Sequence, residues 1–194
     1  NELDWLIQHR FVAVTRRDHD WLFAFDDHTN LVVECLWRLV EGRRIRLTSH
    51  DDGQQFGLPA PVDAAHEINA RLANSTVVTI NLRDSTLDLH LTFDTGHSLE
   101  IIPDSSGYEA WNVENADQKF IAVGGGNLAV FKNDRRIVHN NPLHTEPRAA
   151  RFGEIKVVRR GPVNGGVIQL SPIRRVNNSP RSRSEIDHAA AKEP

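Results

Sequence analysis

The chain has 194 residues, of which 39% are hydrophobic and 25% charged, a composition typical of one globular domain with an appendage or of two very small domains. Its single cysteine, Cys35, excludes an internal disulfide. The longest apolar runs span only a few residues, which excludes a membrane-spanning helix of about 20 residues. With no apolar export segment near the start, we expect a cytoplasmic protein.

Charge divides the chain into two unequal parts. Residues 1–134 hold 11 Lys and Arg against 21 Asp and Glu, and residues 135–183 hold 11 against 2. We therefore predict an acidic body, 1–134, followed by a basic arm, 135–194, rich in proline, glycine and serine. A field of one sign steers an oppositely charged partner, which suggests that charge serves function or assembly. An arm that lies on its own body, or is simply solvated, explains the pattern equally well.

The first strands are expected between residues 10 and 48. Apolar side chains alternate with other residues on both sides of a turn at 26–30, which predicts a hairpin. Because Cys35 lies on the apolar face, its thiol should be unreactive and its pKa raised. The side chains on this face are Trp21, Phe23, Phe25, Leu31, Val33, Cys35, Trp37 and Leu39.

A helix is expected next, from about Pro61 to Ala73. Val62, Ala65, Ile68 (or Asn69) and Leu72 fall at helical spacing, with proline near the start and Asn74 at the end. This helix has an apolar stripe to bury, and we expect it to pack on a face of the sheet.

A second hairpin is expected over residues 87–102, where apolar and polar residues alternate around a turn at 94–97. A third hairpin follows, with its turn at the triple glycine 124–126. A phosphate-binding glycine loop would lead into a helix, whereas this one leads into an apolar strand, which favours the turn. Leu89, Leu91, Phe93 and Leu99 should lie in the core.

The chain also shows weak self-similarity. A shift of 68 residues places Phe25 on Phe93, Leu31 on Leu99 and Val14 on Leu82. This pattern suggests a duplicated three-strand meander, over 10–48 and 77–131, although any two amphipathic hairpins could align as well.

Together these elements predict an α+β fold. A twisted, mostly antiparallel sheet from two similar β-meanders carries the bridging helix, and an irregular basic C-terminal arm follows. Within that arm only 154–158 and 167–170 have the composition of strands.

Candidate catalytic patterns are weak. Asp88, His90 and Asp94 share a strand face, and His97 and Glu100 follow the turn, but their spacing fits no established metal motif. A solvated polar face explains them better. Neither a His-Glu-x-x-His pattern nor a Gly-x-Ser-x-Gly pattern occurs in the sequence. We therefore predict no catalytic residue, metal or cofactor.

The stretch from Tyr108 to Trp111 stands out as a candidate binding site. It places two large rings and a carboxylate after a turn, the composition of a binding hot spot. We predict that Tyr108, Glu109 and Trp111, with Asp94 nearby, contact a partner. The alternative is that Trp111 belongs to the core and Tyr108 caps the sheet edge.

Four sequence features carry a resemblance to a known family: Phe93-Asp94-x-Gly96, Leu99-Glu100-Ile101, Tyr108-Glu109-Ala110-Trp111 and the triple glycine. Residues 89–131 resemble an uncharacterised bacterial domain of unknown function, common in actinobacteria, that carries a Tyr-Glu-Ala-Trp motif. The resemblance implies a small cytoplasmic domain and brings no established activity or catalytic residues.

Two functional classes remain open. The first is a protein-binding module, of the immunity or accessory type, whose acidic body and basic arm dock another protein. The second is an accessory protein that binds nucleic acid through the arm, where arginines suit contacts with phosphates. A small metal-dependent hydrolase using Asp88, His90 and Glu100 is the third and weakest hypothesis. The arm residues predicted to bind a partner are Arg135, Arg136, Arg159, Arg160, Arg174, Arg175, Arg181 and Arg183.

Overall fold

A computed structural model describes residues 2–132 and 155–159, and these residues form mainly β structure. A short 3-10 helix, η1, begins the chain and one α-helix, α1, lies midway. The elements are η1 (Asp4–Leu6), β1 (Phe11–Arg16), β2 (Trp21–Phe25), β3 (Asn30–Val33), β4 (Leu36–Glu41), β5 (Arg44–Thr48), α1 (Ala64–Leu72), β6 (Val77–Leu82), β7 (Leu89–Phe93), β8 (His97–Ile102), β9 (Trp111–Glu114), β10 (Gln118–Val123), β11 (Asn127–Lys132) and β12 (Ile155–Arg159).

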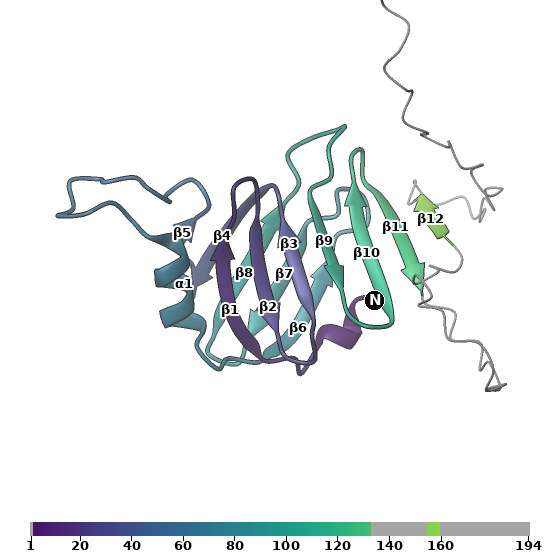
Figure 1. The fold of residues 1–194 in the computed structure, drawn as a ribbon, viewed down its shortest axis with the longest axis horizontal. Helices are drawn as coiled ribbons and strands as arrows, with labels where there is room; N and C mark the ends of the chain where they lie inside the picture. The colour runs from purple at the N-terminus through teal and green to yellow at the C-terminus, as the bar shows by residue number, and fades with distance from the viewer. Residues whose placement is uncertain (1, 133–154, 160–194) are drawn as a thin grey trace, which may run out of the picture.

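The strands form two antiparallel sheets that pack face to face (Figure 1). The larger sheet has the order β1-β2-β3-β9-β10-β11-β12, and the smaller has the order β5-β4-β8-β7-β6. Aromatic rings join the two sheets: the Trp21 and Trp37 centroids are 4.9 Å apart, and those of Phe11 and Phe93 are 6.5 Å apart. The result is a β-sandwich with one shared core.

The predicted combination of strands with one helix is therefore confirmed, but the prediction of a single sheet covered by that helix is wrong. A helix of nine residues is only about 14 Å long, too short to cover a sheet of five strands or more. The apolar faces of the two sheets cover each other instead. All nine side chains expected in the core of the two hairpins are buried: Trp21, Phe23, Phe25, Leu31, Val33, Leu89, Leu91, Phe93 and Leu99.

The alternation from Leu31 to Leu39 suggested one continuous strand, but the run forms two. β3 ends at Val33, the chain crosses between the sheets at Glu34 and Cys35, and β4 begins at Leu36. Both sheets face the same core, so the alternation of buried side chains continues across the crossing. A pattern of period two therefore conceals the change of sheet.

Helix α1 packs against the edge strand β1 rather than on a sheet face. Asp63 caps its first turn by accepting a hydrogen bond from the His66 N–H, and Ile68 and Leu72 are buried, as the spacing predicted. The Asn69 side chain accepts a hydrogen bond from the Val14 N–H and donates one to the Val14 carbonyl, at 2.7 and 3.0 Å. The helix thus covers part of an otherwise open sheet edge. Neither helix in the described part of the chain is long and apolar enough to cross a membrane.

The two halves of the body have the same connectivity. β1-β2-β3 form a meander in the larger sheet before the chain crosses over for β4-β5, and β6-β7-β8 form a meander in the smaller sheet before the chain crosses back. In each sheet the last strand of the meander pairs with the first strand that crosses over from the other half: β3 pairs with β9, and β8 pairs with β4. Exchanging the halves therefore exchanges the sheets.

The strand registers repeat as well. Phe11 pairs with Phe25 beside a register shift in β1, and Val77 pairs with Phe93 beside a register shift at the same place in β6. Val33 lies opposite Trp111, and Ile101 lies opposite Trp37. The common origin of the halves and the boundary between body and arm stay predictions.

One residue of the predicted self-alignment is wrong. Val14 pairs with Phe23, and the position equivalent to Phe23 is Leu91, which pairs with Ile80. Val14 therefore corresponds to Ile80 and not to Leu82. The reason is that the β6–β7 connection, 83–88, is two residues longer than the β1–β2 connection, 17–20, so the shift of 68 does not hold for the first strand.

The predicted arm contributes a strand to the larger sheet. β12 pairs with β11 over Ile155–Arg159, close to the segment 154–158 that had the composition of a strand. The other candidate strand, 167–170, lies outside the described residues.

Candidate functional site

A pocket of about 370 Å³ lies at one end of the sandwich. Three connections meet there: β6–β7, β8–β9 and β10–β11. Polar groups and an aromatic ring share the lining, which includes Ser85, Thr86, Asp104, Ser106, Tyr108 and Gly126. A concave site with a few converging polar groups is the usual form of a binding site.

The triple glycine shapes this pocket. It forms the predicted turn between β10 and β11, and it also packs closely against both neighbouring loops. A Cβ on Gly124 would lie 2.6 Å from the Gly107 backbone, and one on Gly126 would lie 2.2 Å from the Ser85 carbonyl oxygen. Gly126 also has a φ of +77°, which other residues rarely adopt. Backbone-to-backbone contact at these two positions therefore requires glycine.

Tyr108 projects from the rim of the pocket. Its side chain is 81% exposed, the most of any large apolar or aromatic residue that the structure describes. The Ser105 hydroxyl accepts hydrogen bonds from the Gly107 and Tyr108 N–H groups, at 3.2 and 3.1 Å, and so fixes the backbone beneath the ring. An aromatic ring held in water on an ordered turn is well placed to anchor a partner.

Carboxylates crowd beside this rim. The Glu109 carboxylate accepts a hydrogen bond from the Asn112 side-chain amide at 2.9 Å. Partial burial raises the pKa of Glu34, and the nearby carboxylates of Glu109 and Asp20 raise it further, while Arg17 opposes them. Arg17 forms an ion pair with Asp20, and this contact raises the pKa of the guanidinium.

The whole loop end is acidic. The connections 17–20, 34–35, 49–63, 83–88, 103–110 and 124–126 all leave the sheets at this end and together carry ten Asp and Glu against two Arg. Both arginines, Arg17 and Arg83, are in ion pairs with Asp20 and Asp88. A negative potential at the loop end would attract a basic partner.

Cys35 lies in one of these connections but takes no part in the surface. It is 9% exposed, and burial, followed by the charge of Asp104, raises the pKa of its thiol to about 12. The prediction of a buried thiol with a raised pKa is confirmed.

Trp111 is completely buried, so its ring cannot touch a partner. The alternative interpretation, that it belongs to the core, is the one that holds. Its indole N–H donates a hydrogen bond to the Leu87 carbonyl at 2.9 Å. Because Leu87 lines the pocket, Trp111 helps to position the loop that shapes it.

Asp94 does not join Tyr108, which corrects the predicted site. It lies in the β7–β8 turn, at the opposite end of β8 from the β8–β9 connection. Six strand residues separate the two ends, which corresponds to about 20 Å. Asp94 instead accepts a hydrogen bond from the Thr76 N–H at 3.0 Å.

The predicted arginine arm is described only at β12, where the backbone of Arg159 pairs with that of Asn127. The other arm residues of the prediction lie outside the described residues: Arg135, Arg136, Arg160, Arg174, Arg175, Arg181 and Arg183.

The acidic residues of the hydrolase hypothesis are in ion pairs, Asp88 within the β6–β7 connection and Glu100 on the smaller sheet. Arg83 binds Asp88, and Arg38 binds Glu100. His90 Nε2 lies 3.9 Å from Glu100 Oε1. Since arginine engages both carboxylates, neither is well placed to hold a metal or activate water.

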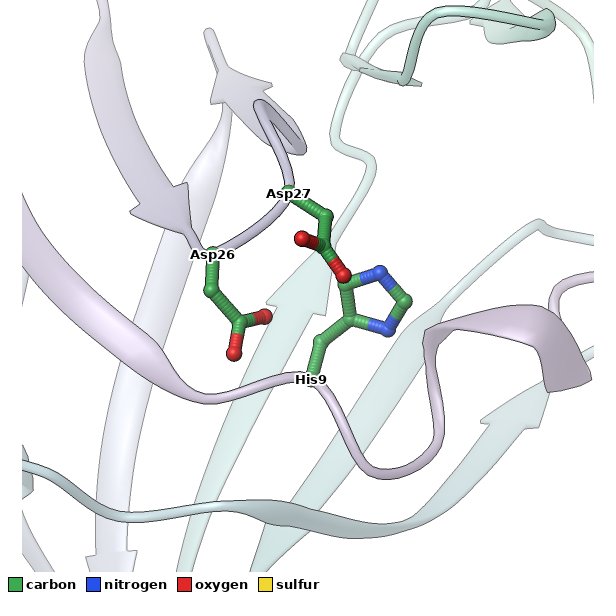
Figure 2. Close-up of side chains that lie close together, drawn as sticks. All are labelled: His9, Asp26 and Asp27. Atoms are coloured by element: carbon green, nitrogen blue, oxygen red, sulfur yellow. The ribbon is translucent and has the colours of Figure 1, made fainter.

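A different group of side chains has the geometry of a metal site. One ligand atom each from His9, Asp26 and Asp27 lies within 4.8 Å of the others (Figure 2). His9 precedes β1, and the two aspartates form the turn between β2 and β3. Sequence reasoning missed this group because no short motif links His9 to residues 26 and 27, which meet only when β1 pairs with β2. The one local signal was an Asp-Asp-His turn.

Comparison with known proteins identifies the family. A family of unknown function, DUF6188, matches residues 3–132, and the chain belongs to it. The match ends where β11 ends and covers every strand from β1 to β11. The predicted resemblance to a domain of unknown function is thus confirmed. Searches of curated proteins and of solved structures found no match.

Proposed function

We propose that this protein is a non-enzymatic protein-binding module whose acidic loop end docks a basic protein. The observation that carries the proposal is Tyr108, which is 81% exposed at the rim of a pocket among crowded carboxylates. An aromatic anchor inside a charged rim is the usual anatomy of a protein-binding hot spot. The role is that of an immunity-type or accessory protein.

The two features of the loop end have different tasks. Burial of the Tyr108 ring and filling of the pocket would supply most of the affinity, because apolar area removed from water stabilises a complex. The acidic rim, including Glu109 and Glu34, would accelerate association and exclude acidic competitors. In this proposal the basic arm, 135–194, adds a second contact to an acidic part of the same partner.

Crosslinking tests the proposal directly. A photoreactive phenylalanine analogue at Tyr108 should capture a protein partner in the native cell. The same analogue at Phe56 should not, although Phe56 is also an exposed aromatic residue, at 68%. The partner should be basic.

Substitutions then test the two tasks separately. After purification from the native cell at moderate salt, Tyr108→Ala should release the partner faster, and Glu109→Lys should slow association. Phe56→Ala should leave both rates unchanged. If Tyr108→Ala and Glu109→Lys both fold and hold the partner with parental affinity, the binding surface lies elsewhere.

The nucleic-acid hypothesis predicts a different result. The affinity of the full chain for RNA or DNA would fall as salt is added. A plot of log affinity against log salt concentration would have a slope of about one unit for each phosphate neutralised, and deletion of 135–194 would abolish that dependence. Submicromolar binding of this kind at physiological salt would favour nucleic acid over a protein partner.

A further inference from the structure

The cluster of His9, Asp26 and Asp27 lies at the end of the sandwich opposite the Tyr108 pocket. It is therefore independent of the proposed protein-binding site. Its ligand atoms, one from each residue, lie within 4.8 Å of one another, and Figure 2 shows the Asp27 carboxylate directed at the His9 ring. We propose that these three residues bind a first-row transition-metal dication such as Zn²⁺.

The second half of the protein provides an internal comparison. Asp26 accepts a hydrogen bond from the Arg10 N–H at 3.0 Å, and at the equivalent place Asp94 accepts one from the Thr76 N–H at 3.0 Å. The first aspartate of each turn therefore has a structural task in both halves. One carboxylate oxygen suffices for that task, and a carboxylate can ligate a metal through the other.

The remaining two ligands belong to the first half alone. The strand register makes Ser75 equivalent to His9 and Thr95 equivalent to Asp27. Reciprocal backbone hydrogen bonds support the first equivalence, because the Phe11 N–H donates to Ser75 and the Val77 N–H donates to His9. The second half thus closes its turn at this place without an imidazole or a second carboxylate, so joining the two strands does not explain why the first half has them.

The turn itself differs in the same way. In the first half Asp27 and His28 have φ values of 51° and 56°, whereas in the second half the position of His28 is occupied by Gly96. Glycine is the residue that accepts this conformation without strain. Aspartate adopts this left-handed conformation more readily than most residues other than glycine, and here it holds the Asp27 carboxylate beside the His9 ring.

Neighbouring contacts fix the His9 ring. Trp5 packs edge-to-face on it, with centroids 5.8 Å apart, and Trp5 in turn stacks on the core residue Phe120 at 6.3 Å. The His9 main chain is also held, because its backbone N–H donates to the Leu6 carbonyl and its backbone carbonyl accepts from the Val77 N–H. The imidazole is thus attached to the core before any metal arrives, which lowers the cost of ordering it.

The ligand set indicates the class of metal. One imidazole nitrogen and two carboxylates are the donors that Zn²⁺ and its neighbours accept, whereas Mg²⁺ and Ca²⁺ prefer oxygen alone. Three protein ligands leave coordination positions for water. A bound ion would join the segment before β1 to the β2–β3 turn and so stabilise the folded state.

Calorimetric titration of the full chain with Zn²⁺ tests the proposal. The chain contains ten histidines, so the decisive comparison is between two matched variants. Asp26→Asn and Asp94→Asn each retain a side-chain oxygen for the backbone N–H, but only Asp26→Asn removes a charged ligand from the cluster. Asp26→Asn should weaken the tightest Zn²⁺ site at least about tenfold, and Asp94→Asn should leave it unchanged.

Thermal unfolding gives an independent readout. Saturating Zn²⁺ should raise the midpoint of the parent and of Asp94→Asn, but not that of His9→Gln or Asp27→Asn. Equal Zn²⁺ affinity in Asp26→Asn and Asp94→Asn, or no saturable binding below about 1 mM, overturns the site. Mg²⁺ binding as tight as Zn²⁺ binding overturns the assigned metal class.

Discussion

The two halves of the body, β1 to β5 and β6 to β11, share a frame and differ in their loops. Connectivity, register and the buried face recur from one half to the other. The β3–β4 connection has two residues, however, and the β8–β9 connection has eight; the β6–β7 connection is also longer than its counterpart. These longer loops form the Tyr108 pocket, whereas the corresponding connections of the first half, 17–20 and 34–35, are too short to do so.

The metal cluster shows the opposite asymmetry. It uses the shared frame, including the aspartate that accepts a backbone N–H in both halves, and adds His9 and Asp27 in the first half alone. Each candidate site is therefore a departure from the repeated pattern. In a sandwich of this kind the shared positions report on stability, and the unshared positions are where binding is to be sought.

The largest effects should appear at shared core positions. Phe25 and Phe93 are equivalent, both are at most 4% exposed, and both pack edge-to-face against Phe11. Phe25→Ala and Phe93→Ala should each destabilise the fold by about 3 to 5 kcal/mol, measured by urea unfolding. If either variant unfolds at the parental midpoint, the two positions are not equivalent in packing.

The features of the fold that depend on local chemistry are predicted correctly from the sequence. Sequence reasoning predicted the hairpins, the helix and the buried face, because alternation, capping and turn residues are all short-range signals. It could not predict that the chain changes sheet at Glu34 and Cys35, since burial continues in the same phase on both sides. Because of that crossing the fold has two sheets, where the sequence suggested one.

The candidate sites show the same limit. Tyr108 and Glu109 were predicted from a local cluster of rings and charge, and they lie at the pocket rim or beside it. Asp94 was wrongly grouped with them because closeness in sequence does not reveal that β8 points the two turns to opposite ends. The His9 cluster forms only when β1 pairs with β2, and no sequence motif indicates it.

The next largest effect should come from a glycine that only the second half requires. A Cβ on Gly126 would lie 2.2 Å from the Ser85 carbonyl oxygen, whereas one on Gly96, which also has a positive φ, would meet nothing within 4 Å. Gly96→Ala should cost about 1 to 2 kcal/mol from backbone strain alone. Gly126→Ala should cost more and also open the pocket, weakening partner capture at Tyr108. Equal unfolding midpoints for the two variants would contradict the close packing of these loops.

A smaller difference should separate the two equivalent tryptophans. Trp111 donates a hydrogen bond to the Leu87 carbonyl, whereas the buried indole N–H of Trp37 has no partner among the described residues. Both rings are fully buried, so their replacement by phenylalanine removes similar apolar area. Trp111→Phe should therefore be more destabilising than Trp37→Phe by about 1 to 3 kcal/mol, the cost of leaving a buried carbonyl unpaired. Identical urea midpoints would mean that the hydrogen bond adds nothing to stability.

The smallest effect should be electrostatic and depend on pH. Burial and the neighbouring carboxylates raise the pKa of Glu34, so ionisation of this group opposes folding. The penalty is present at neutral pH and disappears as the pH falls and Glu34 becomes protonated. Glu34→Gln should therefore stabilise the protein at pH 7 by no more than about 0.5 kcal/mol, because the side chain is largely exposed, and the gain should vanish near pH 3.

Glu41→Gln is the matched control for Glu34→Gln. Glu41 forms an ion pair with Arg46 on the smaller sheet, so its neutralisation should leave stability unchanged or lower it slightly at pH 7. The two substitutions make the same chemical change and should have opposite signs only if carboxylates crowd at the loop end. A lower unfolding midpoint for Glu34→Gln at pH 7 would show that this end is not crowded with negative charge, and it would remove the electrostatic half of the case for a basic partner.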